Sequence, residues 1–591
     1  MQRILYLFFF IGSTCSLSAQ HITGELKTWH TITLTFDGPA TSEYDTLNPF
    51  LNYRLLVTFS KENTQLTIPG YYAADGNAAE TGSRAGNKWQ VRFAAPSPGE
   101  WQYKASFRKG KNISISDDPN AGTAIAPDGT SGSFVVQKTD KKDQDLRYKG
   151  RLIYDNGPYF KFAGTGELFI KGGANSPENL LGYYEFDDTP AKHHFEPHAH
   201  EWNPGDPTWK DGKGKNLIGA LNYLASTGIN TVYFLTMNVM GDGRDVWPWT
   251  DEHERYRFDV SKLDQWEIVF GHMDKLGLVK HVITQETENE CLLDIGQTGI
   301  QRKLYYRELM ARFAHHPGIV WNMGEENGIA PGWSPIGQTD QLRKDMINYM
   351  ADHEPYGNPV VIHTLASLKG HEDILPPLLS DNSLLQGVSF QIHNMAWAYE
   401  TTRKWRKRSM ESGRPWVIWM DEIGPADVGV LPDDHPGQQD SVRREVIWGN
   451  LMAGGAGVEH YFGYKFPHND LSCEDWHSRD RIWKMTSYAT NFFRKLPLAH
   501  MSADNDLTST KDSYCLAAPG DTYVVYLKSG GETTLDLTKA SGKYSVAWYD
   551  PRNGGPMQKG SVTTLKGGDI RALGAPPDNP QSDWAVLIKR K

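Results

Sequence analysis

Between about residues 150 and 505, amphipathic stretches with helical spacing of hydrophobic residues alternate with short apolar runs. In 216–226, Leu217, Leu221 and Leu224 share one helical face, Gly228 ends the stretch, and the β-branched run 229–237 follows. The same succession returns with helical segments at 263–276 and 302–316, each followed by an apolar run at 278–284 and 318–323. These repeats predict successive strand and helix units.

Further apolar runs bring the expected strands to eight, and two of these runs follow helical segments at 401–410 and 441–452. The remaining strands are expected at 168–172, 360–364, 387–392, 416–420 and 457–462. Strands that alternate with helices over about three hundred residues predict a (β/α)8 TIM barrel at 150–505. Periodicity alone leaves a doubly wound open sheet as the alternative.

Both flanks of this region have the pattern of β-sandwiches, so the chain as a whole belongs to the α/β class. Residues 21–140 hold β-type runs separated by turn signals, which predicts an N-terminal Ig-like sandwich, and the charged stretch 138–143 suits a linker. Residues 507–591 return to short strands between Gly- and Pro-rich turns, which predicts a small C-terminal sandwich. The expected strands are 31–36, 53–59, 88–93 and 101–107 on one flank, and 513–518, 522–527, 533–537, 544–549 and 584–589 on the other.

The first twenty residues have the composition of a secretory signal peptide. Met1 and Arg3 precede an apolar run at 4–11 and small residues at 16–20. The apolar run is too short to span a bilayer. We therefore expect an exported protein, periplasmic or secreted, without a membrane span.

Charge and cysteine usage narrow the classes of partner and cofactor. A net charge of -10 argues against nucleic acid, because phosphate binding requires a basic face. The four cysteines show no spacing typical of a metal or redox site. Histidines cluster at His193, His194, His198 and His200, but in a Pro-rich stretch without the helical His-Glu-x-x-His spacing. We therefore expect no catalytic metal and no cofactor.

Carboxylates follow the fourth and seventh expected strands. The fourth strand leads into Glu325 and Glu326, and the seventh leads into Asp421 and Glu422. Side chains at the C-terminal ends of barrel strands meet at the barrel mouth, and glycoside hydrolysis needs a carboxylate pair there. One member must be ionised to attack the anomeric carbon, and the other must hold a proton for the leaving oxygen.

At these residues the chain resembles glycoside hydrolase clan A. The segment 321–326 is similar to the clan's Trp-x-Leu-Gly-Asn-Glu pattern, which implies Glu326 as acid/base. Glu422 with its two following residues is similar to the clan's Glu-aromatic-Gly pattern, which implies Glu422 as nucleophile. The chain departs from the clan at Glu325, where Asn is usual, and at Ile423, where an aromatic is common. Glu325 is therefore the rival acid/base, or an acceptor for the sugar 2-hydroxyl.

More narrowly, the chain resembles a bacterial polysaccharide-degrading group with three parts. These are an N-terminal sandwich domain of uncharacterised function, the barrel, and a C-terminal domain named for collagen binding. The segment 548–554 and Trp584 are similar to the signature of that last domain. Fusion to such a barrel favours a structural cap or a sugar-binding module over a collagen-binding role.

Other strand ends are expected to supply the walls of the pocket. The expected polar contacts to substrate are Asn175, Asn238, Gln285, Glu286, His393 and Asn394, and the expected sugar-stacking rings are Trp249, Trp397 and Tyr461. His393 matches the Tyr or His that commonly holds the nucleophile in the clan.

The sequence thus predicts a retaining glycoside hydrolase acting on a polysaccharide or oligosaccharide. The first alternative is a non-catalytic carbohydrate- or matrix-binding protein on a barrel scaffold, and a metallohydrolase is the second. The sugar, its linkage, exo or endo action and the oligomeric state stay open.

Overall fold

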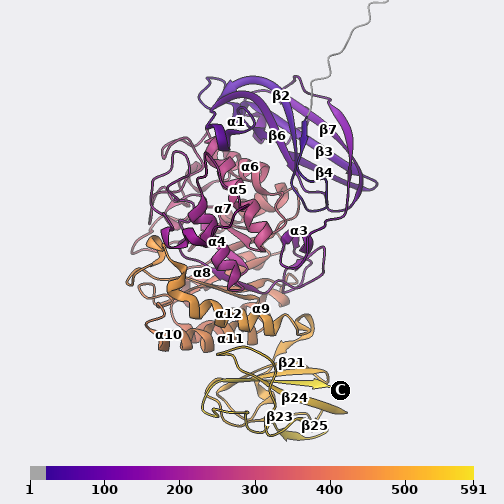
Figure 1. Cartoon of the computed structure of the whole chain (residues 1–591), viewed down its shortest axis with the longest axis vertical. Helices are drawn as coiled ribbons and strands as arrows, with labels where there is room; N and C mark the ends of the chain where they lie inside the picture. Colours follow the sequence, from indigo (N-terminus) through magenta and orange to yellow (C-terminus); the bar gives the residue numbers. More distant parts are fainter. Residues whose placement is uncertain (1–20) are drawn as a thin grey trace, which may run out of the picture.

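A computed structural model describes residues 21–591 as three bodies arranged in a line, a β-sandwich, a barrel and a second β-sandwich (Figure 1). The expected signal peptide lies outside these residues. Within 21–591, none of the helices combines the length and apolar character needed to cross a bilayer.

The N-terminal body consists of two antiparallel sheets packed through aromatic side chains. One sheet has the order β1 (His21–Thr23), β2 (Ile32–Ser42), β6 (Ala85–Phe93), β5 (Tyr71–Tyr72). The other joins β4 (Thr64–Pro69), β3 (Tyr53–Lys61), β7 (Gly99–Lys109) and β8 (Thr123–Ala124), with β9 (Ser131–Val136) also paired to β7. Along β7, buried and exposed residues alternate, as expected of a strand with one face in a core. Phe59 and Phe93 stack at 4.0 Å between the two sheets.

This sandwich packs closely against the barrel. Phe50 meets Phe258 edge to face at 5.4 Å. The buried Arg92 of β6 pairs with Asp264 at 3.1 Å and lies 3.3 Å from Glu267, both on helix α5 (Val260–Leu276). Burial of apolar rings beside a paired charge fixes the orientation of the two bodies.

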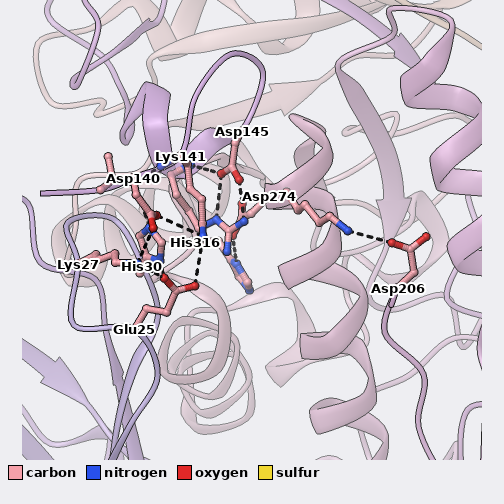
Figure 2. A network of polar contacts seen from close by, with 12 residues as sticks. Glu25, Lys27, His30, Asp140, Lys141, Asp145, Asp206, Asp274 and His316 are labelled. Atoms are coloured by element: carbon pink, nitrogen blue, oxygen red, sulfur yellow. Dashed lines mark hydrogen bonds and ion pairs between the residues drawn. The ribbon is translucent and has the colours of Figure 1, made fainter. Parts of the chain in front are cut away.

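The charged stretch 138–143, which follows the N-terminal sandwich, contacts the segment 25–27 at the beginning of that sandwich. Lys27 pairs with Asp140 at 2.7 Å, and Lys141 lies 3.3 Å from Glu25. Figure 2 shows these side chains pointing toward one another, close to the buried contact of His316 with Asp274. Since exposed pairs of this kind contribute little to stability, we assign them a role in the path of the linker.

The central body is a closed barrel of eight parallel strands, which confirms the TIM barrel and excludes the doubly wound sheet. The first strand begins three residues later than expected, because Leu168 bridges to Lys161 instead of entering the barrel. The strands are β12 (Lys171–Ala174), β13 (Thr231–Leu235), β14 (Val279–Ile283), β15 (Ile319–Asn322), β16 (Val360–His363), β17 (Gly387–Ile392), β18 (Val417–Ile423) and β19 (Gly457–His460).

Helices cover the outside of this barrel, and each expected helical segment is present. Their buried faces carry the apolar side chains that the periodicity indicated, such as Leu217, Leu221 and Leu224 on α4. The main helices besides α5 are α4 (Lys215–Ser226), α6 (Ile300–Phe313), α7 (Asp340–His353), α8 (Leu368–Ile374), α9 (Ala398–Glu411), α10 (Pro436–Ser441), α11 (Trp448–Met452) and α12 (Asp480–Phe493). A π-helical segment, Val442–Ile447, joins α10 to α11.

The barrel interior is charged below its mouth. Lys171 pairs with Asp421 at 2.6 Å and Glu459 at 3.1 Å, and its ammonium lies 3.8 Å from the centre of the Trp419 ring. Gly173 leaves room for the Glu459 side chain, because a Cβ at position 173 would lie 2.5 Å from it. These two buried acids thus share one buried lysine as their cationic partner.

The C-terminal body is a second sandwich, with a six-stranded sheet facing a two-stranded one. The larger sheet has the order β20 (Ser502–Ala503), β21 (Ser513–Ala518), β22 (Thr522–Leu527), β27 (Trp584–Arg590), β24 (Lys543–Tyr549), β25 (Thr564–Lys566), and the smaller pairs β23 (Thr534–Asp536) with β26 (Ile570–Ala572). Trp548 and Trp584 meet edge to face in its core. In Figure 1, α11 and α12 lie between this body and the barrel.

Arg443 connects the barrel to the C-terminal sandwich and provides a test of that interface. Its guanidinium donates to both carboxylate oxygens of Asp583, at 2.9 and 2.7 Å, and both side chains are buried. The Arg443→Met substitution would leave the Asp583 charge without its cation, so we expect a loss of about 3–5 kcal/mol in the free energy of unfolding. Urea unfolding measures this loss. The control Arg403→Met removes an exposed pair with Glu400 and should change stability by less than about 0.5 kcal/mol. Equal stability of the two variants would contradict this role.

Candidate active site

An acidic pocket opens at the C-terminal ends of the barrel strands. It has a volume of about 310 Å³. Eight of its lining residues are carboxylic acids, and they come from six of the eight strands or the loops that follow them. The lining consists of Glu178, Asp242, Glu286, Thr287, Glu288, Glu325, Glu326, Trp333, Gln391, Glu422, Ala426, Tyr461, Tyr464 and Asp470.

Glu422 is brought into this pocket by an irregularity in β18. Phe390 pairs with Met420 and Gln391 pairs with Glu422, so Asp421 is an extra residue in the register. A bulge of this kind redirects the side chains around it. Asp421 bonds to Lys171 in the barrel interior, while Glu422 lines the pocket.

Gln391 and His363 hold the Glu422 carboxylate. The side-chain amide of Gln391 donates a hydrogen bond to Glu422. His363 accepts the backbone N–H of Glu326 at Nδ1, at 3.0 Å, which leaves its proton on Nε2, 3.7 Å from Glu422. Burial lowers the pKa of His363 well below its usual range, so this ring is a neutral donor.

Glu326 stands across the same amide. Its backbone has a left-handed conformation, with φ 39, which costs strain for a residue other than glycine and is typical of functional positions. Burial raises the pKa of Glu326 to about 7, although a hydrogen bond with Gln391 lowers it and the charges of Glu288 and Asp242 raise it further. Glu326 therefore holds a proton more readily than an exposed glutamate.

Burial also raises the pKa of Glu422 well above its usual range, and the charges of Glu326 and Glu325 act in the same direction. The hydrogen bond from Gln391 opposes this by favouring the ionised form. Two acids that share one amide and repel each other behave as one coupled pair.

Glu325, the rival of Glu326, lies beside Glu422. Oxygens of these two carboxylates and a ring nitrogen of His363 all lie within 4.8 Å of one another. Burial raises the pKa of Glu325 to about 8. On its other side is Glu178, whose pKa is raised well above its usual range by burial and by the charges of Asp470 and Glu325.

Of the predicted site residues, five line the pocket, and the others lie elsewhere. The five are Glu286, Glu325, Glu326, Glu422 and Tyr461.

Three predicted polar residues instead brace the structure around the pocket. Asn175 donates to the backbone oxygen of Asp421 at 2.9 Å. Asn238 closes the following loop by bonding the backbone and side chain of Asp245. Gln285 accepts a hydrogen bond from the buried Arg302. Side chains after a strand turn to nearby backbone or charges as readily as to a cavity.

The remaining predicted contacts lie outside the pocket. His393 and Asn394 are exposed, and the contacts to Glu422 come from Gln391 and His363 instead. Trp249 is buried and packs against Tyr305 at 5.5 Å. Trp397 lines a separate surface groove with Trp405 and Leu368.

Sequence reasoning named neither Asp470 nor the rings Trp333 and Tyr464 as site residues. Asp470 accepts a hydrogen bond from Ser176, which fixes the long loop after β19 against the loop after β12. No local pattern marks these positions, and Asp470 and Trp333 also lie well beyond the strand ends in sequence.

Two members of the histidine cluster, His193 and His198, have hydrogen-bond partners within the protein at both ring nitrogens. His193 contacts Glu474 at 3.0 Å and Asn179 at 2.7 Å. His198 contacts Glu201 at 2.6 Å and accepts the backbone N–H of Trp476. His198, Glu201 and His477 are close enough to hold a cation, although a metal would have to displace these hydrogen bonds.

Comparisons with known proteins give two family matches. Residues 25–108 match a "Domain of unknown function (DUF5060)", and residues 499–589 match a "Putative collagen-binding domain of a collagenase". The comparison with curated proteins gives no match.

Several solved structures share the fold. A structure from Bacteroides vulgatus described as a "putative glycoside hydrolase" is 16% identical with a TM-score of 0.65, over 96% of this chain and 99% of its own. A second, described as a glycoside hydrolase, is 14% identical with a TM-score of 0.52, over 76% of this chain and 99% of its own. A glycoside hydrolase family 5 structure from Bacteroides vulgatus is 15% identical with a TM-score of 0.51, over 76% of this chain and 95% of its own.

The eight-stranded barrel, its flanking sandwiches and these comparisons agree with the resemblance seen in the sequence. The chain therefore combines a (β/α)8 barrel, in a fold shared with structures named as glycoside hydrolases, with a C-terminal region that matches the family described as a "Putative collagen-binding domain of a collagenase".

Proposed function

We propose that this protein is a retaining glycoside hydrolase acting on a polysaccharide or oligosaccharide, with Glu422 as nucleophile and Glu326 as acid/base. The single observation that carries the proposal is that both carboxyl groups line one pocket, where the Gln391 amide donates a hydrogen bond to Glu422. A fold shared with structures named as glycoside hydrolases supports it.

In the first step, an oxygen of ionised Glu422 attacks the anomeric carbon while Glu326 gives its proton to the leaving glycosidic oxygen. The glycosidic bond breaks and a covalent glycosyl ester forms on Glu422. In the second step, Glu326 removes a proton from water, which attacks the same carbon and releases Glu422. Both acids end in their starting protonation states, so no cofactor is required.

The surrounding residues favour this division of roles. Glu422 faces two donors, the amide of Gln391 and Nε2–H of His363, which suit a carboxylate that must stay ionised. Glu326 has acidic neighbours, and these suit a carboxyl group that must hold a proton. The left-handed backbone of Glu326 also supports these roles, because its N–H donates to His363, which lies 3.7 Å from Glu422.

The raised pKa of Glu326 predicts the basic side of the pH profile. The acid must be protonated in the first step, so raising the pH through about 7 should remove the active form and lower kcat/KM tenfold per pH unit above it. At low pH, protonation of Glu422 should lower the rate as well, giving a bell shape whose two limbs belong to the coupled pair. A profile that stays level from pH 6 to 9 would contradict the acid role.

The test of the proposal is the release of new reducing ends from a panel of plant, algal and bacterial glycans. We expect at least one glycan to be cleaved, with the anomeric configuration of the first product, followed by NMR, matching that of the substrate. Binding to a glycan without any release would favour the alternative of a carbohydrate-binding protein, and an inverted product would overturn the retaining mechanism. Full activity in the presence of a chelator would separate this enzyme from a metallohydrolase.

We also propose, from the first twenty residues of the sequence, that the enzyme acts after export. The C-terminal sandwich then serves as a cap on the barrel, because its Tyr526 stacks on the buried Trp448 of α11 at 4.7 Å.

A further inference from the structure

The proposed reaction uses two of the eight acids in the pocket, and the other six have no role in it. Among the described residues that line the pocket there is no Lys or Arg to balance them. Elsewhere in the same barrel, buried acids do have such partners, as Asp421 and Glu459 have Lys171. The excess of negative charge is therefore particular to the cavity.

Several of these acids present oxygens that the protein does not use. Oε2 of Glu325 and Oε2 of Glu286 have no hydrogen-bond partner within residues 21–591, although their residues are only 6% and 5% exposed. Oε1 of Gln391, beside Glu422, is also without one. Buried polar atoms in native proteins are nearly always paired, so these three acceptors indicate a ligand rich in donors.

The distribution of the acids matches a ligand the size of a sugar better than a single ion. Glu178, Glu286, Glu325 and Asp470 come from four different loops, and the cavity of about 310 Å³ has room for one or two sugar rings. Tyr461, Tyr464 and Trp333 also line it. Aromatic faces bind both the apolar side of a sugar and a nearby cation.

Neutral hydroxyl groups would satisfy the free oxygens one at a time but would leave the charge uncompensated. A protonated amine offers three donors and a positive charge at one point, and charge-assisted hydrogen bonds are the stronger kind. We infer that the substrate is a glycan containing amino sugars, whose ammonium group binds Glu325 together with Glu178 or Glu286. This inference rests on the proposed function, since it names the substrate of the same site.

Binding of a cation would also prepare the catalytic pair. Burial and mutual repulsion raise the pKa values of Glu325 and Glu422 in the empty pocket, which favours protonated acids. An ammonium group beside Glu325 reverses the sign of the nearest charge and so favours ionised Glu422. Binding of the substrate would then bring Glu422 into the ionised form that attacks the anomeric carbon.

The test compares matched sugars binding to the full chain near pH 6, where the amine is charged. Methyl glycosides of glucosamine, galactosamine and mannosamine are titrated by calorimetry beside their N-acetylated and 2-hydroxyl counterparts. We expect at least one amine to bind about tenfold or more tightly than both of its counterparts. Glu325→Gln should abolish that preference, so that the amine and its neutral counterparts bind with affinities within about twofold of one another. Glu400→Gln, on the exposed face of α9, is the matched control and should keep the preference.

Three results would overturn the inference. One is equal or weaker binding of every amine relative to its neutral counterpart. Another is a preference that survives Glu325→Gln. The third is micromolar binding of Ca²⁺ or Mn²⁺ that Glu325→Gln removes, because Glu325, His363 and Glu422 would then form a metal site.

Glycan cleavage separates this inference from the proposed function. Cleavage of neutral glycans without any preference for amines would refute the inference and leave the hydrolase intact. A clear amine preference without cleavage of any amino-sugar oligomer would refute the hydrolase and leave the pocket as a binding site for amino sugars.

Discussion

Replacing Glu422 with Gln is expected to lower kcat by on the order of 10⁴-fold or more, the largest effect of any single substitution in this chain. The amide has nearly the same shape as the carboxylate but cannot attack the anomeric carbon. Glu422 is almost completely buried, accepts a hydrogen bond from Gln391 and lies 3.7 Å from His363, so its carboxylate is held in one orientation. Steady-state rates on the best glycan of the panel, with the fold checked by thermal unfolding, measure this effect.

Rescue by azide sharpens the test of Glu422. In the shortened variant Glu422→Ala, azide can enter the space that the carboxylate leaves and attack the same carbon, giving a glycosyl azide of the opposite anomeric configuration to the substrate. Glu400→Gln, an exposed glutamate on α9, is the control and should keep full activity. Retention of turnover in Glu422→Gln would remove the nucleophile assignment and, with it, the proposed mechanism.

The sequence predicted the barrel because its strands are buried on both faces. β13 is buried at every position and is a nearly continuous apolar run, while helices such as α4 show a regular stripe. Only the first strand begins later than predicted. Leu168 is the first residue of an apolar run, but it pairs with Lys161 outside the barrel. The hydrophobic pattern alone could not distinguish an apolar residue within a barrel strand from one that lies just before the strand.

The candidate site was predictable only where it depends on strand ends. Glu326 lies shortly after β15 and Glu422 lies near the C-terminal end of β18, and so their common location follows from the barrel. The bulge at Asp421 and the contacts of His363 depend on the pairing register, which no local pattern specifies. Asp470 joins the pocket through a loop whose path is fixed by a bond to Ser176, nearly three hundred residues earlier in the chain.

The second large effect separates Glu326 from Glu325, two adjacent acids that the sequence alone could not rank. A general acid matters most when the leaving group is poor, because a good leaving group departs without a proton. For Glu326→Gln we expect kcat/KM to fall about 10²–10⁴-fold on natural glycans and to fall little on aryl glycosides with acidic phenols. Matched aryl glycosides of graded phenol acidity, assayed for both variants, give the comparison.

Glu325→Gln is the matched variant, because it removes the neighbouring acid, which lines the same pocket. Since Glu325 lies within 4.8 Å of Glu422 and His363, its loss should weaken substrate binding to the same extent for every leaving group. The two variants should also differ in pH dependence: the fall in rate above about pH 7 should disappear in Glu326→Gln and persist in Glu325→Gln. Azide should restore Glu326→Gln with a product of unchanged anomeric configuration, because attack then occurs on the glycosyl ester of Glu422. The opposite pattern, with leaving-group dependence confined to Glu325→Gln, would transfer the acid/base role to Glu325.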